Sequence, residues 1–119
     1  MIKSYKDLEI WKRGVELVRN IYLLTEDFPK SKTYALIDQI RRAALSIPSN
    51  IAEGHARQHQ KEFRQFLFVA LGSLAELETQ LIIAGKLGYL EKEKLNRSSS
   101  EMDAIGKMTR GLIKRLQIK

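Results

Sequence analysis

The two histidines of the chain, His55 and His59, lie four residues apart and close to Glu53, a spacing that suggests a metal site. Because Gly54 is expected to end a helix, the pair would lie in a turn, and we predict solvent-exposed histidines rather than metal ligands. A di-iron helical bundle needs Glu-x-x-His pairs on its inward faces, and no glutamate here has a histidine three residues on. The chain has no cysteine, no glycine-rich phosphate loop and no serine with an evident base. We therefore predict no catalytic residue, no metal and no cofactor, and a protein that is not an enzyme.

Positive charge is the main chemical signal. The chain carries 21 Lys and Arg against 14 Asp and Glu, a formal net charge of +7. From Gly106 onward it has no acid and five bases, and three of them, Lys107, Arg110 and Lys114, share one helical face. Such a row is usually a solvated face, but phosphate contacts use the same residue types. The candidate nucleic-acid-binding residues are Arg41, Arg42, Arg57, Lys107, Arg110, Lys114 and Arg115.

Aromatic residues are not interleaved with this row, which argues against a stacking platform for single strands. Lys119 is the last of the five bases.

Two acids in an apolar stretch, Glu76 and Glu78, are the second chemical feature. Because an unpaired buried carboxylate is costly, we expect Arg41 and Arg42 on the preceding antiparallel helix to pair with them. Ion pairs that fix the helix register are the expected role, and contact of these arginines with a ligand or phosphate is the alternative. Asp38 can also pair with Arg42 four residues on. On this interpretation Glu76→Leu destabilises the fold by about 1–4 kcal/mol.

The segment R-R-A-A-L-S-I-P-S-N-I-A-E-G, residues 41–54, must position these groups. Pro48 lacks an amide hydrogen and crowds the carbonyl of Ala44, so it predicts a kink. The apolar spacing nevertheless runs through the proline, which favours one kinked helix ended by Gly54 as a left-handed C-cap. The polar face that is expected to satisfy the backbone groups freed by the proline is Gln39, Ser46, Asn50 and Glu53. For Asn50 and Glu53 a recognition patch is the alternative, and Ser49 is a further polar position of the motif.

The first helix is expected to start at a capping box of Ser4 and Asp7 and to end at Phe28-Pro29, with K-S-K-T as the following turn. Its predicted core stripe is Leu8, Trp11, Val15, Val18 and Tyr22. A second apolar row, Ile10, Leu17, Ile21 and Leu24, lies beside it. Two rows are wider than one bundle core needs, so we expect the second row to have another partner.

The third helix, about Gln60 to Lys86, has an unbroken heptad seam of Phe63, Leu67, Ala70, Leu74, Leu77, Leu81 and Ala84. Further apolar residues point elsewhere, namely Phe66, Phe68, Val69, Leu71, Ile82 and Ile83. A helix that is apolar nearly all round is normally buried on all sides, so we predict burial between subunits.

Gly85 and Gly88 mark the end of the third helix, and Y-L-E-K-E-K opens the fourth. The fourth seam is Leu95, Met102, Ile105, Thr109, Leu112 and Leu116, and Ser98, Ser99 and Ser100 suggest fraying in its first half. No alternating strand pattern competes. We predict an all-α single domain over residues 1–119, an antiparallel up-down-up-down four-helix bundle with a proline-kinked second helix, assembling as a homo-oligomer.

The N-terminal residues lack the apolar core of a signal peptide, and no uncharged apolar run reaches the roughly 18 residues of a membrane span. The absence of cysteine fits a reducing compartment. We expect a cytoplasmic protein without a membrane partner.

With these residues in view, the chain resembles the 23S rRNA intervening-sequence proteins. The resemblance is strongest in Q-I-R-R-A-A-L-S-I-P-S-N-I-A-E-G (residues 39–54), in residues 66–81 and in Y-K-D-L-E-I-W near the start. It implies an antiparallel bundle that forms a ring-like homopentamer. A similar fold serves as the accessory protein of diversity-generating retroelements, a basic pentamer that binds reverse transcriptase and nucleic acid. The positions that transfer, none of them catalytic, are Arg41, Arg42, Ser49, Asn50, Glu53, Gly54, Glu76 and Glu78.

Two functions follow as hypotheses. The first is an oligomeric, non-enzymatic module that binds structured RNA or other nucleic acid, since a ring multiplies a weak basic patch. The alternative is a scaffold that docks a protein partner such as a polymerase through the polar face of the second helix, without touching nucleic acid.

Overall fold

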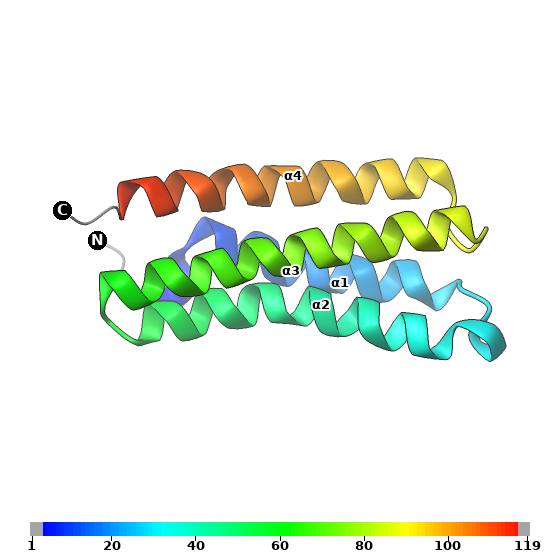
Figure 1. Ribbon diagram of the computed structural model, residues 1–119, viewed down its shortest axis with the longest axis horizontal. Helices are drawn as coiled ribbons and strands as arrows, with labels where there is room; N and C mark the ends of the chain where they lie inside the picture. The colour runs from blue at the N-terminus through cyan, green and yellow to red at the C-terminus, as the bar shows by residue number, and fades with distance from the viewer. Residues whose placement is uncertain (1–3, 117–119) are drawn as a thin grey trace.

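The computed structural model describes residues 4–116, which form a short 3-10 helix and four α-helices, with no strand in that range. The elements are η1 (Tyr5–Asp7), α1 (Glu9–Glu26), α2 (Lys30–Ala56), α3 (Gln60–Lys86) and α4 (Lys92–Arg115). Figure 1 shows the helices lying lengthwise side by side, with η1 and the end of α4 toward the same end of the rod. The rod measures 49 × 20 × 20 Å. The predicted all-α class with four helices is confirmed. Lys119 lies outside the described residues.

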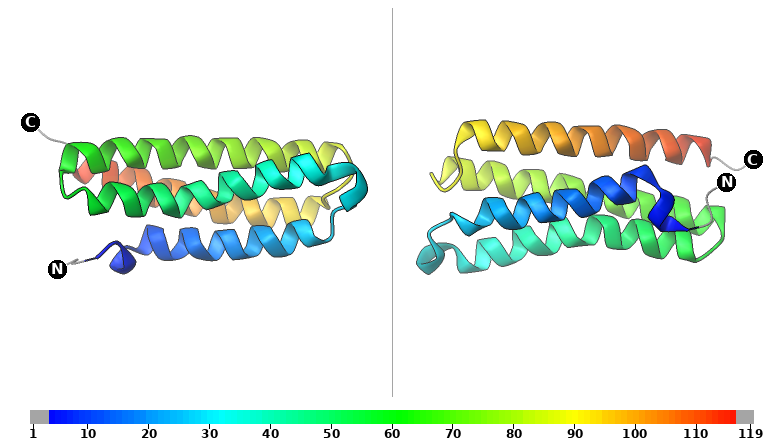
Figure 2. Two further views of the ribbon diagram at one scale, coloured as in Figure 1. Left: turned by 90° about the horizontal axis from the view of Figure 1, so that it is seen from below. Right: turned by 180° about the vertical axis from the view of Figure 1, so that it is seen from behind.

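Each helix packs against two neighbours: α2 lies against α1 and α3, and α4 lies against α3 and α1. Figure 2 shows that η1, the α2–α3 turn and the end of α4 lie at the same end of the rod. The start of α1 and the end of α4 therefore meet there, and the start of α4 meets the end of α1 at the opposite end.

Helix α2 runs unbroken through Pro48, as the apolar spacing predicted. The proline is buried, and a Cβ built on Gly14 of α1 would lie 3.3 Å from the Pro48 Cβ, so the two helices approach closely here. Ser46 Oγ donates to the Ala43 carbonyl at 2.7 Å, and Asn50 Nδ2 donates to the Ser46 carbonyl at 2.7 Å. Both bonds end on carbonyls that precede the proline, and neither reaches the carbonyl of Ala44, which Pro48 leaves without its helical donor. The expected repair of that group is therefore not found in these two bonds.

The prediction that Gly54 ends α2 is wrong. The helix continues to Ala56, and the left-handed residue of the turn is Gln58, with φ 63°. Gly54 is buried, and a Cβ there would lie 2.5 Å from the Phe66 Cβ of α3. The glycine is therefore required for close packing of α2 on α3 rather than for a backbone conformation. At the other turn Gly88 does adopt a left-handed conformation, with φ 83°.

Two helix starts also differ from the expectation. Ser4 Oγ accepts from the Lys6 amide at 3.1 Å and so caps η1, whereas α1 begins at Glu9 after Leu8 without a side-chain cap. The segment K-S-K-T is the first turn of α2, because Pro29 is already at the N-cap position. The α1–α2 turn is consequently confined to residues 27–29.

The most deeply buried row of α1 is not the predicted core stripe, although Leu8 of that stripe is buried and Trp11 and Val18 are half-buried against the core. The row that contains Ile10, Leu17 and Ile21 is buried, while Val15 and Tyr22 of the expected core stripe are 42% and 36% exposed. Two rows of similar apolar character give no sequence signal for which one faces the bundle. The apolar surface that α1 leaves exposed in the predicted stripe is confined to Val15 and Tyr22.

Helix α3 buries all seven residues of its predicted seam. Phe68, Val69, Ile82 and Ile83 on the remaining surface are 42–51% exposed. By length and composition α3 is apolar enough to cross a membrane, with a mean hydropathy of 1.6, but the core helix of a soluble bundle passes the same test. These four side chains outnumber the exposed large apolar residues of α1 or of α2 in the described part of the chain.

Helix α4 is unbroken through Ser98–Ser100, so the expected fraying is not found. Ser98 is buried in the packing side of the helix, together with Met102, Ile105 and Thr109. Near the end of the helix Ile113 is buried, and the predicted seam residue Leu112 is half-buried. The last turns of α4 are rotated slightly from the expected seam, which turns Leu112 toward the side of α1.

Candidate nucleic-acid interface

Arg41 lies between α1 and α2 and is held there by several contacts. Its Nε donates to Thr25 Oγ1 at 2.9 Å, and Nη2 lies 3.4 Å from the Tyr22 carbonyl and 3.5 Å from Glu26 Oε2. The guanidinium carbon is also 4.4 Å from the centroid of the Tyr22 ring. With its side chain 24% exposed, Arg41 joins the two helices, and its Nε and Nη2 donors are already used within the chain.

The other two arginines of α2 are paired as well. Arg42 Nε donates to Asp38 Oδ2 at 3.0 Å, which confirms the predicted pair four residues apart. Arg57 bonds Glu53 at 3.1 Å and Glu62 at 3.3 Å, so it connects α2 with α3, and the hydrogen bond to Glu53 raises the pKa of the Arg57 guanidinium above its ordinary value. Ligand binding at either site would compete with a pair already formed within the chain.

The expected pairing of Glu76 and Glu78 with Arg41 and Arg42 is wrong. Glu76 is exposed and accepts a hydrogen bond from Gln80 Nε2 at 3.3 Å, and Glu78 is half-buried beside α4. The heptad seam of α3 turns Glu76 to solvent, and Arg41 turns to α1 instead of α3. Because Glu76 is solvated, the large destabilisation expected for Glu76→Leu no longer follows.

The basic residues of α4 are in a different situation. Lys107, Arg110, Lys114 and Arg115 are all exposed, and none of them forms an ion pair with any residue between 4 and 116. Lys107, Arg110 and Lys114 lie on the side of α4 that points away from the buried row, as predicted. Of the residues proposed from sequence, these four retain their donors for an external anion.

The two histidines do not form a metal site with their neighbours. His55 is half-buried inside α2, where its ring lies edge-on to Phe63 with centroids 5.4 Å apart, and His59 is exposed at the N-cap of α3. Over residues 4–116 no group of three or more His, Cys, Asp or Glu side chains is close enough to hold a metal ion. The prediction that both histidines are solvent-exposed is wrong for His55, because α2 extends two residues past Gly54.

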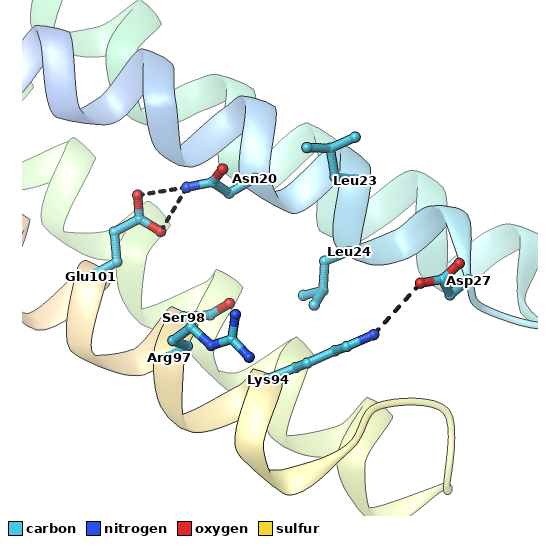
Figure 3. Close-up of a pocket in the computed structure, with 8 residues that line it drawn as sticks. All are labelled: Asn20, Leu23, Leu24, Asp27, Lys94, Arg97, Ser98 and Glu101. Atoms are coloured by element: carbon cyan, nitrogen blue, oxygen red, sulfur yellow. Dashed lines mark hydrogen bonds and ion pairs between the residues drawn. The ribbon is translucent and has the colours of Figure 1, made fainter.

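A hollow of about 340 Å³ lies between the end of α1 and the start of α4, and Figure 3 shows its polar groups paired across the two helices. Asn20 Nδ2 donates to both oxygens of Glu101, at 3.3 and 3.1 Å. Lys94 Nζ lies 3.6 Å from Asp27 Oδ2 and 3.8 Å from Glu91 Oε1. Most of the charged groups in this hollow therefore already have partners within the chain.

Partial burial raises the pKa of the Glu101 carboxyl, and Glu16 raises it further, whereas the hydrogen bond from Asn20 and the charge of Arg13 oppose the shift. Sequence reasoning missed the Asn20–Glu101 contact. The two residues are 81 positions apart, and no spacing rule connects them. Only the arrangement of α1 against α4 brings them together.

Comparisons with known proteins identify the family and a structure of the same fold. A family model described as 23S rRNA-intervening sequence protein matches residues 6–111. A crystal structure of a protein with unknown function from the S23 ribosomal protein family of Bacteroides thetaiotaomicron superposes with a TM-score of 0.80 at 24% identity, covering 88% of this chain and 98% of that one. At that identity the likeness shows the fold alone. No protein with a curated description matches the chain.

Proposed function

The chain belongs to the 23S rRNA-intervening sequence protein family, and from this premise we propose that it is a non-enzymatic, oligomeric bundle that binds structured RNA in the cytoplasm. The proposal includes an antiparallel up-down-up-down course of the four helices and a closed ring of identical subunits. The family resemblance suggests five subunits. No catalytic residue is part of the proposal.

The exposed apolar surface of α3 supports oligomerisation. Phe68 and Val69, and Ile82 and Ile83 about 20 Å further along the helix, are apolar side chains that a single chain leaves 42–51% exposed on the outward side of α3. Between the two pairs lie the exposed residues Gly72, Ala75, Glu76 and Thr79. Removing the exposed half of such side chains from water contributes roughly 1 kcal/mol each. Val15 and Tyr22 of α1, 42% and 36% exposed, give a second, smaller apolar surface. Two different surfaces are what a head-to-tail ring contact requires.

The mass in solution tests the assembly. Sedimentation at micromolar concentration should give a species several times the 13.7 kDa of one chain. Ile83→Glu, which places a charge on the exposed face of α3, should shift it toward the monomer while the helix content stays unchanged. A folded wild-type monomer over that concentration range would contradict the ring.

The observation that supports nucleic-acid binding is the set of exposed lysine and arginine side chains on α4, which form no ion pair within residues 4–116. Lys107, Arg110 and Lys114 span about 10 Å along the helix at 1.5 Å per residue. Phosphate oxygens are the acceptors that such a row of cations fits. A ring of subunits would repeat the row around its circumference, so that weak single contacts add up.

Electrophoretic binding to a structured RNA over a salt series tests this function. Affinity should fall as salt rises, with a log–log slope of roughly 0.7–0.9 per phosphate contact. Lys107→Glu with Lys114→Glu should lower the affinity and flatten the slope. Lys86→Glu with Lys92→Glu makes the same change in net charge at exposed positions away from the row and is the matched control. Binding that is absent at low salt, or equal loss in both pairs of variants, would contradict the proposal.

The alternative function, a scaffold that docks a partner through the polar face of α2, gains less support from the geometry. Ser46 and Asn50 bond the backbone of their own helix, and Arg42 bonds Asp38. A pull-down from nuclease-treated lysate separates the two functions, because only a direct protein partner should survive the nuclease.

A further inference from the structure

A second, larger groove, of about 610 Å³, lies between the start of α1 and the end of α4. It is at the end of the rod where η1 and the end of α4 lie, opposite to the hollow of Figure 3 (Figures 1 and 2). This end groove is lined by Asp7, Leu8, Glu9, Ile10, Lys107, Met108, Gly111, Leu112 and Arg115. Its volume is in the range of small-ligand pockets.

The floor of the end groove is apolar. Leu8 and Ile10 belong to the buried core, and Met108 and Leu112 are half-buried, so part of each of these two side chains faces the groove. Gly111 has no side chain to project into the groove from α4. A Cβ built at this position has only Arg115 Nη1 within 4 Å, at 3.9 Å, so the space in front of the glycine is open. A flat apolar group can therefore approach the backbone of α4 closely.

The two rims of the end groove carry opposite charge. Lys107 and Arg115 stand on the α4 rim about 12 Å apart along the axis, and neither is ion-paired to a residue in the described part of the chain. On the opposite rim Glu9 bonds Arg13 at 3.5 Å, whereas Asp7 is exposed and has no such pair within residues 4–116. The groove thus offers two cations, an apolar floor and one carboxylate acceptor.

We propose that the end groove receives a single unpaired nucleobase of the bound RNA, with Lys107 and Arg115 on the phosphates that flank it. The inference rests on the proposed function and makes it more specific. A base has apolar faces and a polar edge, and it can enter a groove only when it is not stacked in a duplex. Met108 and Leu112 would cover its face, and Asp7 would accept from an exocyclic amino group, which adenine, cytosine and guanine carry and uracil lacks.

The absence of aromatic residues beside the basic row does not oppose this inference. Flipped bases are held between apolar as well as aromatic side chains. The planar guanidinium of Arg115 can also stack on a base, since arginine takes part in such contacts in RNA complexes. The contact concerns one base in a groove and not a strand laid along a stacking platform.

Two RNAs that differ in one nucleotide test the inference. The first is a perfectly paired hairpin, and the second is the same hairpin with one bulged adenine. The wild-type oligomer should bind the bulged RNA about five- to a hundredfold more tightly, as expected for one base that gains a stacking partner. Gly111→Leu fills the groove without changing any charge, and it should remove this preference while leaving affinity for the paired hairpin unchanged. Melting of the variant followed by circular dichroism verifies that it folds.

A second measurement does not depend on a variant. With 2-aminopurine in place of the bulged adenine, binding should shield its fluorescence from acrylamide. Equal affinity of the wild type for both hairpins, a preference that persists in folded Gly111→Leu, or a bulged base that stays fully open to quencher would each overturn the inference while leaving the proposed function in place. Absence of binding to both hairpins at low salt would overturn the proposed function and this inference together.

Discussion

The α2–α3 and α1–α4 interfaces of the bundle are packed very differently. Between α2 and α3 the backbones come so close at Gly54 that no Cβ fits in front of Phe66. Between α1 and α4 there is a hollow at each end, one of about 340 Å³ and one of about 610 Å³. Close packing contributes dispersion contacts that an open seam lacks. We infer that the α2–α3 pair carries more of the stability and the α1–α4 pair more of the binding capacity.

The two ends of the α1–α4 interface differ in turn. At the end shown in Figure 3, Asn20, Asp27, Lys94 and Glu101 bond one another across the helices. At the other end Lys107 and Arg115 point to solvent above an apolar floor. The same pair of helices therefore satisfies its charges at one end and leaves them available at the other, which is why we place the nucleobase contact in the end groove.

The largest effect on this comparison is expected from Gly54→Ala. The new Cβ would lie 2.5 Å from the Phe66 Cβ, an atom fixed to the backbone of α3, so the helices would have to separate. Overpacking of this kind costs about 1–3 kcal/mol, more than the gain in helix propensity returns. Urea unfolding should show the loss as a lower midpoint at unchanged slope. An unchanged midpoint would mean that the α2–α3 interface is less close than described.

The same substitution in the open seam should act in the opposite direction. At Gly111 a Cβ meets nothing closer than 3.9 Å, so Gly111→Ala adds helix propensity without a clash. We expect about 0.5–1 kcal/mol of added stability in the same urea experiment. A loss instead of a gain would show that the end groove closes in solution, and the contrast between the two interfaces would then disappear.

The sequence predicted the fold well where one periodic signal stood alone. The seam of α3 is unbroken, and all seven of its residues are buried. The spacing through Pro48 likewise indicated one helix, since apolar positions continue on both sides of the proline. The sequence was misleading where two signals of equal strength competed, as in the two apolar rows of α1. Gly54 was assigned to a cap because sequence alone cannot distinguish a glycine that permits backbone approach from one that ends a helix.

The candidate site was predictable only in part. The row on α4 followed from helical spacing, and its exposure agrees with that prediction. The partners of Arg41 could not be predicted, because they depend on which side of α2 faces α1. The end groove could not be predicted either. Its lining residues come from two segments about 100 positions apart, and no local sequence pattern shows that these segments leave a space between them.

A smaller effect, visible as pH dependence, is expected from Glu101→Gln at the Figure 3 end. Burial raises the pKa of the Glu101 carboxyl in the folded chain, so the folded state holds the proton more strongly than the unfolded state. The wild type then loses stability as the pH rises from the ordinary glutamic acid pKa through the raised value. Because Gln does not titrate, the stability of Glu101→Gln relative to the wild type should increase across that pH window and stay constant above it. The increase should be less than about 1 kcal/mol, since the group is partly solvated. Thermal melts between pH 4 and pH 8, read at roughly 0.5-unit steps, measure this difference. A difference that does not vary with pH would place the Glu101 carboxyl in solvent.

The smallest effect should come from the ion pair that crosses the same hollow. Lys94 and Asp27 are separated by 3.6 Å, but their side chains are 40% and 75% exposed, and Lys94 has Glu91 as a second partner at 3.8 Å. Exposed pairs contribute little because water screens the charges and two long side chains must be ordered.

A double-mutant cycle of Asp27→Asn and Lys94→Gln should therefore give a coupling energy below about 0.5 kcal/mol that vanishes in high salt. A coupling above about 1 kcal/mol would instead make this end a tight electrostatic seam. The difference between the two interfaces would then lie in charge and not in packing, since one would be joined by apolar contact and the other by ions.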